Sequence, residues 1–294
     1  MLRICDKEVH VTSGLIRIAH IEGDSYEFVE NPDAVLDNLR GSGTRVDLFT
    51  FMQIMPETSP KYDYPMEWDN LAVLPVSTFD HWWKKQIRSV SRNRARQAEK
   101  KGVTLRAAPF NDDLVRRISG IYNECPVRQG RPFPHYGKSI EAVHEMTATF
   151  LDSSVFIGAF LGEELIGFVK LTWDQSRSQA NLMSIVSMIA HRDKAPTNAL
   201  IARAVRYCAD NGIRHLVYQK FSYGKKDRDT LSDFKEKCGF QRVDLPRYYV
   251  PLTTLGRFAF QLGFHHRLVD RIPSSVLDKY REYRTEWYNR GLRS

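Results

Sequence analysis

Long apolar runs are missing from this chain of 294 residues, and cysteine is scarce. No stretch approaches the ~20 apolar residues that a helix needs to cross a bilayer. Residues 1–10 carry charges where a signal peptide would have its apolar core. The four cysteines form no C-x-x-C pair and have no histidine partner at zinc-ligand spacing. These absences predict a reduced, cytoplasmic protein without a structural metal.

Repeats, low-complexity segments and nucleophile motifs are absent too. No similarity recurs at a period of about 20–50 residues, which argues against a solenoid or a propeller. No Ser/His/Asp or Cys/His arrangement can be read from the sequence, so nothing indicates a covalent intermediate. Hydrophobic residues make up 42% of the chain and charged residues 27%, as in an ordinary globular protein. The length is sufficient for one large or two modest domains.

What the sequence does have is an excess of positive charge, with a formal net charge of +8. Residues 84–106 hold nine lysines and arginines against one acid, Glu99. A helix is predicted from about Thr78 to Lys101, ended by Gly102. Helical spacing puts four cations on one stripe and an apolar set on the other face: Lys85, Arg88, Arg92 and Arg96 against Trp83, Ile87, Val90 and Ala98. We interpret the stripe as a contact for phosphate, on tRNA or on a nucleotide-linked acceptor. A solvated connecting helix is the alternative.

Short strands and helices are predicted on either side of this basic segment. Three strands and one helix precede it: residues 15–21, 46–54, 71–76 and 32–40. A strand, two helices and a hairpin follow it: residues 103–108, 112–124, 139–151 and 155–173. The loop at 125–138 concentrates cations and hydrogen-bonding groups between prolines and glycines. Such a loop is typical of ligand recognition, although a solvated basic loop has the same composition.

The stretch from Asn181 to Phe240 carries the most specific pattern. A strand candidate at 181–189 is followed by H-R-D-K-A-P-T-N and by a helix that begins at Pro196 and ends at Gly212. A second strand, a basic loop and a short helix that ends at Gly239 come next: residues 215–221, 222–229 and 231–238. The start of the Pro196 helix offers free amides and a positive dipole end to an anion.

This order of elements resembles the coenzyme side of the GNAT acyltransferase fold. The segment Y-G-K-K-D-R-D-T-L-S-D-F-K-E-K-C-G-F, residues 223–240, is similar to the F-K-x-x-x-G-F region of the Fem-type branch of that superfamily. The basic segment 84–103 resembles the helix that joins the two GNAT-like halves of such proteins. Together the matches cover roughly residues 80 to 250.

The resemblance implies an α/β (α+β) fold of the GNAT type, with a mixed, mostly antiparallel sheet flanked by helices. The N-terminal part is too short for a complete GNAT lobe, so we expect a reduced first lobe. The predicted division is a reduced N-terminal lobe, a basic connecting helix, an acyltransferase lobe and a helical tail: residues 1–80, 81–102, 103–255 and 256–294.

Fem-type enzymes move an amino acid from aminoacyl-tRNA onto a peptidoglycan precursor or a similar amine. The acetyl-CoA pyrophosphate loop of other GNAT enzymes reads Q/R-x-x-G-x-G/A, and here Arg192 is followed by Ala195 and Thr197 at the last two places. Aminoacyl-tRNA is therefore the favoured donor, with acyl-CoA as the alternative and no tightly bound cofactor. A non-catalytic nucleic-acid-binding or scaffold protein on a degenerate GNAT core is the third interpretation.

Catalytic candidates follow from the resemblance and from side-chain chemistry. Aminolysis needs a neutral amine, a path for its proton and stabilisation of the tetrahedral oxyanion. Lys235 matches the lysine of the F-K motif, which the resemblance places at the donor carbonyl or phosphate; an exposed helix lysine is the alternative. His135 is a candidate base because an unperturbed imidazole titrates near neutral pH. A structural histidine is the alternative there.

The binding groups are predicted from the loops around these residues. Donor contacts are expected at the start of the Pro196 helix and in the basic loop: Arg192, Lys194, Thr197, Asn198, Tyr223, Lys225 and Lys226. Contacts with an acceptor that carries phosphate or carboxylate are expected in the loop 125–138: Arg128, Gln129, Arg131, Tyr136 and Lys138. The tail from residue 255 mixes apolar and basic residues, so packing on the protein is favoured over contact with a membrane surface. The acceptor, the transferred group and the oligomeric state stay open.

Overall fold

The computed structural model describes residues 2–5, 7–21, 23, 29–128, 131–174, 176–223 and 229–266. These residues form two compact units. Within the described part, the first unit takes residues 2–72, 220–223 and 242–266, and the second takes 73–219 and 229–241. No helix in the described part has the length and apolarity to cross a membrane.

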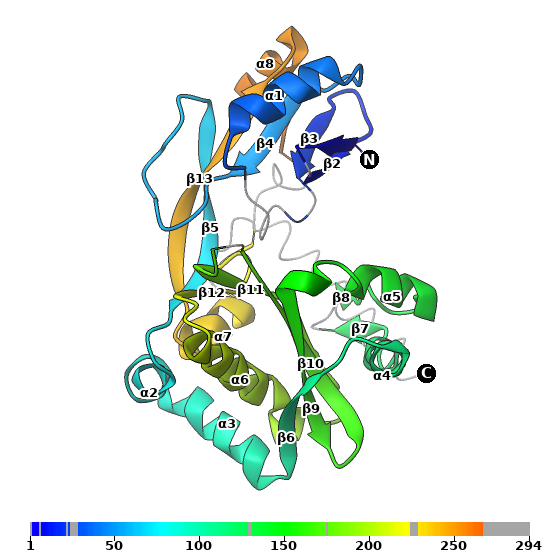
Figure 1. Ribbon diagram of the computed structural model, residues 1–294, viewed down its shortest axis with the longest axis vertical. Coiled ribbons are helices and arrows are strands. Elements are labelled where there is room, and N and C mark those ends of the chain that lie inside the picture. Colours follow the sequence, from blue (N-terminus) through cyan, green and yellow to red (C-terminus); the bar gives the residue numbers. More distant parts are fainter. Residues whose placement is uncertain are drawn as a thin grey trace. The chain divides into compact units, whose positions relative to one another are not determined.

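The first unit is a twisted sheet covered by a helix (Figure 1). Its strand order is β1 (Leu2–Ile4), β2 (Lys7–Val11), β3 (Ile18–Ile21), β4 (Leu48–Met52), β13 (Gln241–Pro251) and β5 (Met66–Pro75). Strands β3 and β4 are parallel, whereas β13 pairs with β4 in the antiparallel sense. Helix α1 (Pro32–Gly41) supplies Val35, Leu36 and Leu39 to the core, and α8 (Thr254–Gln261) follows β13.

Local sequence explains where α1 begins. Asn31 caps it by accepting a hydrogen bond from the backbone N–H of Ala34 at 3.2 Å. Pro32 occupies the first helical position, where no intrahelical N–H is needed.

The second unit is a sheet with helices on both sides (Figure 1). Its strand order is the end of β5, then β12 (His215–Val217), β11 (Gln179–Ser187), β10 (Glu164–Trp173), β9 (Ser154–Leu161) and β6 (Val103–Ala108). Only β11 and β12 are parallel among these pairs. Helices α4 (Asp112–Tyr122) and α5 (Ile140–Thr147) lie on one side, and α3 (Ser89–Lys100) and α6 (Pro196–Asp210) on the other.

Smaller elements complete this unit. They are α2 (Phe79–His81), a π-helical turn (Trp82–Gln86), α7 (Thr230–Lys237), the two-stranded hairpin of β7 (Val127–Arg128) and β8 (Arg131–Pro132), and short 3₁₀ turns at Leu151–Ser153 and Arg192–Lys194. Three sequence signals are confirmed: Pro196 is the first residue of α6, and Gly212 and Gly239 adopt positive φ angles of 69° and 95° after α6 and α7.

The prediction of one continuous basic helix from Thr78 to Lys101 is wrong. Ile87 is extended, with φ −72° and ψ 132°, so α3 begins only at Ser89. The break buries the Ile87 side chain and lets the Arg88 N–H donate to the carbonyl of Lys237 at 3.0 Å. Lys85 therefore does not share a helix with the later arginines of the stripe. Val90, expected on the apolar face, is exposed.

Candidate active site

A cavity of about 730 Å³ lies within the second unit. That volume is in the usual range for a small-ligand site. Its walls come from α3, the β7–β8 hairpin, the end of β11, the start of α6, the residue after β12 and α7: Arg94, Arg128, Arg131, Pro132, Phe133, Pro134, Ile185, Val186, Ser187, Met188, Ile189, Arg192, Ala195, Pro196, Thr197, Asn198, Tyr218, Thr230, Leu231 and Phe234.

Apolar walls and positive charge are combined in this cavity. Four arginines line it, Arg94, Arg128, Arg131 and Arg192, and none of the described residues lining it is Asp or Glu. Apolar side chains exclude water and so strengthen the attraction between these cations and an anion. The cavity therefore suits a ligand that joins an apolar part to a phosphate or carboxylate.

The N-terminus of α6 adds backbone donors to the cavity wall. Thr197 and Asn198 stand in the first helical turn, where amide groups have no intrahelical acceptor. The positive end of the helix dipole reinforces them. The structure thus places three predicted donor contacts, Arg192, Thr197 and Asn198, along one cavity. The hydroxyl of Thr197 also lies 2.8 Å from that of Ser187 at the end of β11.

Ala195 precedes this helix in a left-handed conformation, with φ 53° and ψ 43°. Glycine adopts this conformation without strain, whereas for alanine it costs roughly 1–2 kcal/mol. The backbone thus turns as a glycine-containing loop would, although the residue carries a side chain.

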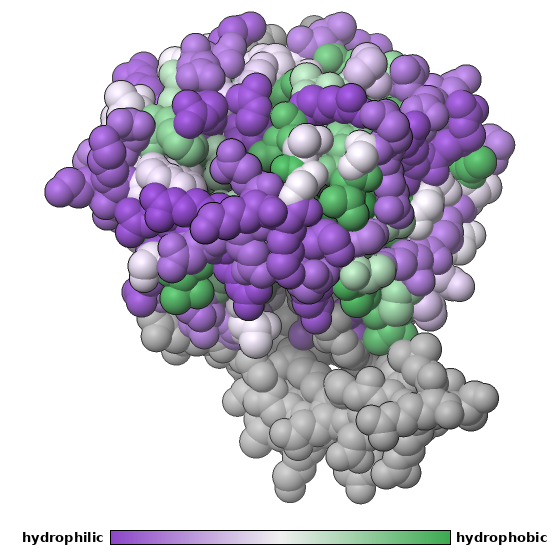
Figure 2. Space-filling view, turned by 90° about the horizontal axis from the view of Figure 1, so that it is seen from below, coloured by the Kyte–Doolittle hydropathy of each residue, from purple (hydrophilic) through white to green (hydrophobic). Residues whose placement is uncertain are grey.

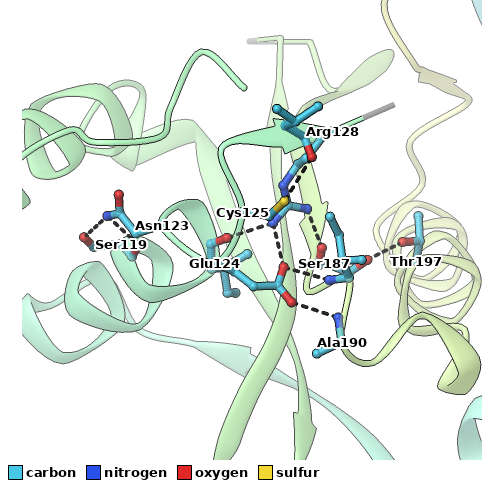
Figure 3. A network of polar contacts seen from close by, with 11 residues as sticks. Ser119, Asn123, Glu124, Cys125, Arg128, Ser187, Ala190 and Thr197 are labelled. Atoms are coloured by element: carbon cyan, nitrogen blue, oxygen red, sulfur yellow. Dashed lines mark hydrogen bonds and ion pairs between the residues drawn. The ribbon is translucent and has the colours of Figure 1, made fainter. Parts of the chain in front are cut away.

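Glu124, which was not among the residues predicted from the sequence, holds the loop between β11 and α6 (Figure 3). Its two carboxylate oxygens accept hydrogen bonds from the backbone N–H groups of Ile189 at 2.7 Å and Ala190 at 2.8 Å. Arg128 donates to the same carboxylate at 3.1 Å. These bonds tie the loop after β11 to the end of α4. The only sequence signal was a Glu at the end of the predicted helix 112–124 and an Arg four residues later.

Arg128 itself is held by the protein. It donates to the carbonyl of Ser187 at 2.6 Å and to that of Ile121 at 2.8 Å. Its guanidinium also lies over the Phe133 ring, 4.6 Å from the centroid. Burial lowers the pKa of Arg128, and nearby Glu124 opposes that shift. Arg128 therefore shapes the cavity wall, whereas Arg131 is exposed.

The predicted base His135 and the predicted acceptor contacts Tyr136 and Lys138 are not among the described residues that line the cavity. His135 stacks on Tyr122 with ring centroids 4.6 Å apart, and burial lowers the pKa of its imidazole, with Lys138 adding to the effect. Its Nδ1 is buried with no hydrogen-bond partner among the described residues. Tyr136 is exposed and Lys138 is half-buried. Gln129 lies outside the described residues.

Lys235 is buried, so the interpretation as an exposed helix lysine is wrong. Its ammonium lies 4.5 Å from the centroid of the Tyr218 ring, and Tyr218 lines the cavity. Burial lowers the pKa of Lys235 to about 8, while the charge of Asp229 acts in the opposite direction. A cation thus lies directly beneath an aromatic residue of the cavity wall.

The remaining predicted donor contacts are dispersed. Lys194 pairs with Asp193 at 3.3 Å and is absent from the cavity lining among the described residues. Tyr223 belongs to the first unit, whereas the cavity lies wholly in the second. Lys225 and Lys226 lie outside the described residues.

The four cations of the predicted phosphate stripe make different contacts. Lys85 is exposed, Arg88 pairs with Glu236, and Arg92 donates to the carbonyl of Trp83 at 3.0 Å. Arg96 lies 5.5 Å from the Trp83 ring centroid and lines a second hollow of about 580 Å³. Figure 2, seen from below the view of Figure 1, shows a face on which hydrophilic side chains surround exposed apolar ones. Arg94, which the stripe left out, is the arginine of α3 that reaches the candidate active site.

No family model matches the sequence, and no curated protein matches it either. Solved structures do match. FemX has a TM-score of 0.60 at 11% identity, over 87% of this chain and 86% of FemX. L-PGS from Bacillus licheniformis has a TM-score of 0.58 at 14% identity, over 86% of this chain and 84% of that one.

A third solved structure is also similar in fold. It is the C-terminal domain of a putative lysylphosphatidylglycerol synthetase from Agrobacterium fabrum, with a TM-score of 0.54 at 13% identity over 86% of this chain and 83% of that one. At such identities the likeness concerns the fold. The predicted mixed, mostly antiparallel sheet with flanking helices is confirmed, and so is the Fem-type resemblance at the level of fold.

Proposed function

We propose that this protein is an acyltransferase that moves an aminoacyl or acyl group onto an amine and forms an amide. The observation that carries the proposal is the arginine-lined cavity between the N-terminus of α6 and helix α7. The likeness of the chain's fold to those of FemX and L-PGS also supports the proposal. The cytoplasmic location expected from the sequence remains a prediction.

The chemistry needs a site that stabilises negative charge as the amine attacks the donor carbonyl. Lys235 is proposed to supply a buried positive charge beneath Tyr218, whose side chain lines the cavity where the oxyanion develops. A pKa of about 8 leaves the lysine mostly protonated at neutral pH. The attacking amine must be neutral. As its nitrogen bonds to the donor carbonyl carbon, the ester or thioester bond breaks, and the amine's proton passes, directly or through water, to the departing hydroxyl or thiol.

Aminoacyl-tRNA is the favoured donor. Its 3′ end joins phosphates to an aminoacyl ester, which matches arginines arranged around apolar walls. The last two small positions of the acetyl-CoA loop, a glycine and a glycine or alanine, are occupied here by Ala195 and Thr197, so backbone approach to a pyrophosphate is restricted. The free amides of α6 keep acyl-CoA as the alternative donor.

The acceptor is proposed to carry phosphate or carboxylate groups. The name lysylphosphatidylglycerol synthetase denotes a product that joins lysine to a phosphate-bearing lipid. Arg131, exposed at the cavity wall and part of the predicted acceptor loop, is the side chain that we assign to such a group.

Binding and turnover together test these assignments. The melting temperature of the protein is measured with coenzyme A, acetyl-CoA and tRNA, because a ligand that binds the folded state raises it. Mass spectrometry then follows products formed from charged tRNA and an amine mixture. A higher melting temperature with coenzyme A, together with acetylated products, would show that acyl-CoA and not aminoacyl-tRNA is the donor.

A non-catalytic nucleic-acid-binding role is the second candidate, and the exposed arginines of α3 favour it. Arg94 and Arg96 are exposed on different sides of that helix, each beside a hollow. Salt-sensitive tRNA binding without any product from either donor would support this role and exclude the transferase.

A further inference from the structure

Three side chains of metal-binding types converge in the first unit: two are neighbours in the sequence, and the third is distant from both. Glu67 comes from β5, and His265 and His266 follow α8. Oε1 of Glu67 lies 3.0 Å from Nε2 of each histidine. The three ligand atoms all lie within 4.8 Å of one another.

The trio combines one fixed ligand with two accessible ones. The His265 side chain is only 1% exposed. Its ring contacts those of Tyr249 and Phe260, with centroids 4.6 and 4.9 Å away. Side chains of His266 and Glu67 are 41% and 36% exposed. A hydrated ion can therefore reach a site whose deepest ligand is already oriented.

We propose that Glu67, His265 and His266 bind a Zn²⁺ ion. Two imidazole nitrogens and a carboxylate oxygen form a ligand set that Zn²⁺ accepts, with a fourth position left to water. Ca²⁺ and Mg²⁺ prefer oxygen ligands, and Mg²⁺ keeps several waters, so neither suits two imidazoles. Ligand atoms about 3 Å apart around one oxygen need only a small adjustment to surround an ion.

This proposal departs from the expectation of no structural metal. That expectation relied on the short Cys and His spacings that mark common zinc sites. Here the carboxylate stands 198 residues before the first histidine, so only the fold reveals the set. The ion would act as a clip that fastens the segment after α8 to β5. The proposed Zn²⁺ site does not depend on the proposed acyl transfer, since the candidate active site lies in the other unit.

Calorimetric titration of the full chain with ZnCl₂, after removal of metals by chelation, tests the proposal. The expected result is one Zn²⁺ per chain and a higher melting temperature with metal. His266→Ala and Glu67→Gln should each weaken binding by at least about 100-fold, because even outer-shell changes cost 10–100-fold in affinity. Substituted Co²⁺ should give a visible spectrum that both variants lose.

The matched control is His10→Ala, which removes an exposed histidine from another pair in the same unit, His10 and His20. It should keep full affinity. Each variant is first melted without metal, and an unchanged melting temperature shows that the fold persists. The proposal fails if wild type binds no Zn²⁺, if His266→Ala and Glu67→Gln bind it normally, or if His10→Ala abolishes binding.

Discussion

At the scale of single residues, Lys235 is the side chain on which the proposed chemistry rests most. Lys235→Met removes the charge and keeps most of the volume. If the charge stabilises the transition state, turnover should fall on the order of 10²-fold, as when an oxyanion-hole donor is lost. Lys237→Met changes an exposed lysine on the same helix and should leave turnover unchanged. Equal rates in both variants would remove Lys235 from the mechanism.

The same buried lysine should make stability depend on pH. Its folded pKa of about 8 lies below the ordinary value of 10.5, so the unfolded chain binds more protons between these two values. The free energy of unfolding of wild type should therefore rise, relative to Lys235→Met, from about pH 8 to pH 10.5. The expected gain is on the order of 1–3 kcal/mol. Urea denaturation of both proteins at pH 7.5 and pH 10 measures this gain. An equal change in the free energy of unfolding of wild type and Lys235→Met would contradict the prediction.

Glu124 is expected to matter for stability, because two backbone N–H groups and one guanidinium donate hydrogen bonds to its carboxylate. Glu124→Ala leaves them without their acceptor and should destabilise the protein by about 2–4 kcal/mol. Glu163→Ala, at a side chain that is 86% exposed, should stay within about 0.5 kcal/mol. Thermal melting distinguishes the two. A Glu124 variant as stable as the Glu163 variant would mean that water replaces the carboxylate.

At the scale of elements, two helical glycines provide a matched pair. A Cβ on Gly256 of α8 would lie 1.8 Å from the carbonyl oxygen of Asp47, so α8 would have to move. Gly256→Ala should cost more than about 2 kcal/mol, as overpacking of a close contact does. Gly120→Ala in α4 meets nothing within 4 Å and should stabilise by about 0.5–1 kcal/mol. The prediction fails if both substitutions change the melting temperature in the same direction.

The elements also separate what local sequence could predict from what it could not. Pro196, Gly212 and Gly239 mark helix boundaries through backbone preferences that act within a few residues, so these boundaries were predicted correctly. The break at Ile87 was missed because it depends on burial and on a bond to Lys237, 149 residues later than Arg88.

The site divides in the same way. Arg192 and Asn198 could be placed at the cavity because they lie close to the start of α6, which Pro196 marks in the sequence. Arg94 and Glu124 could not, since each reaches the cavity region through packing between elements distant in the chain. The burial of Lys235 was equally hidden, because it depends on Tyr218 and not on neighbours in the helix.

At the scale of the whole molecule, the first unit depends on a strand made late in the sequence. β13 pairs with β4 and supplies Tyr248 and Val250 to the core. A chain that ends at Phe240 should therefore lose hydrogen-exchange protection in β1 to β4 and keep it in β9 to β11. Mass spectrometry of exchanged peptides measures both regions. Protection retained in β4 would show that this strand is stable without β13.

The late arrival of β13 also bears on synthesis in the cell. The hydroxyl of Tyr248 donates to Gln53, and 195 residues separate the two. At ribosomal speeds of about 5–20 residues per second, β4 waits roughly 10–40 s for this partner. During that interval β4 can pair with β3 but lacks β13 on its other edge, whereas β9, β10 and β11 emerge in immediate succession. The nascent chain is thus expected to pair β9, β10 and β11 of the second unit before the sheet of the first unit is complete.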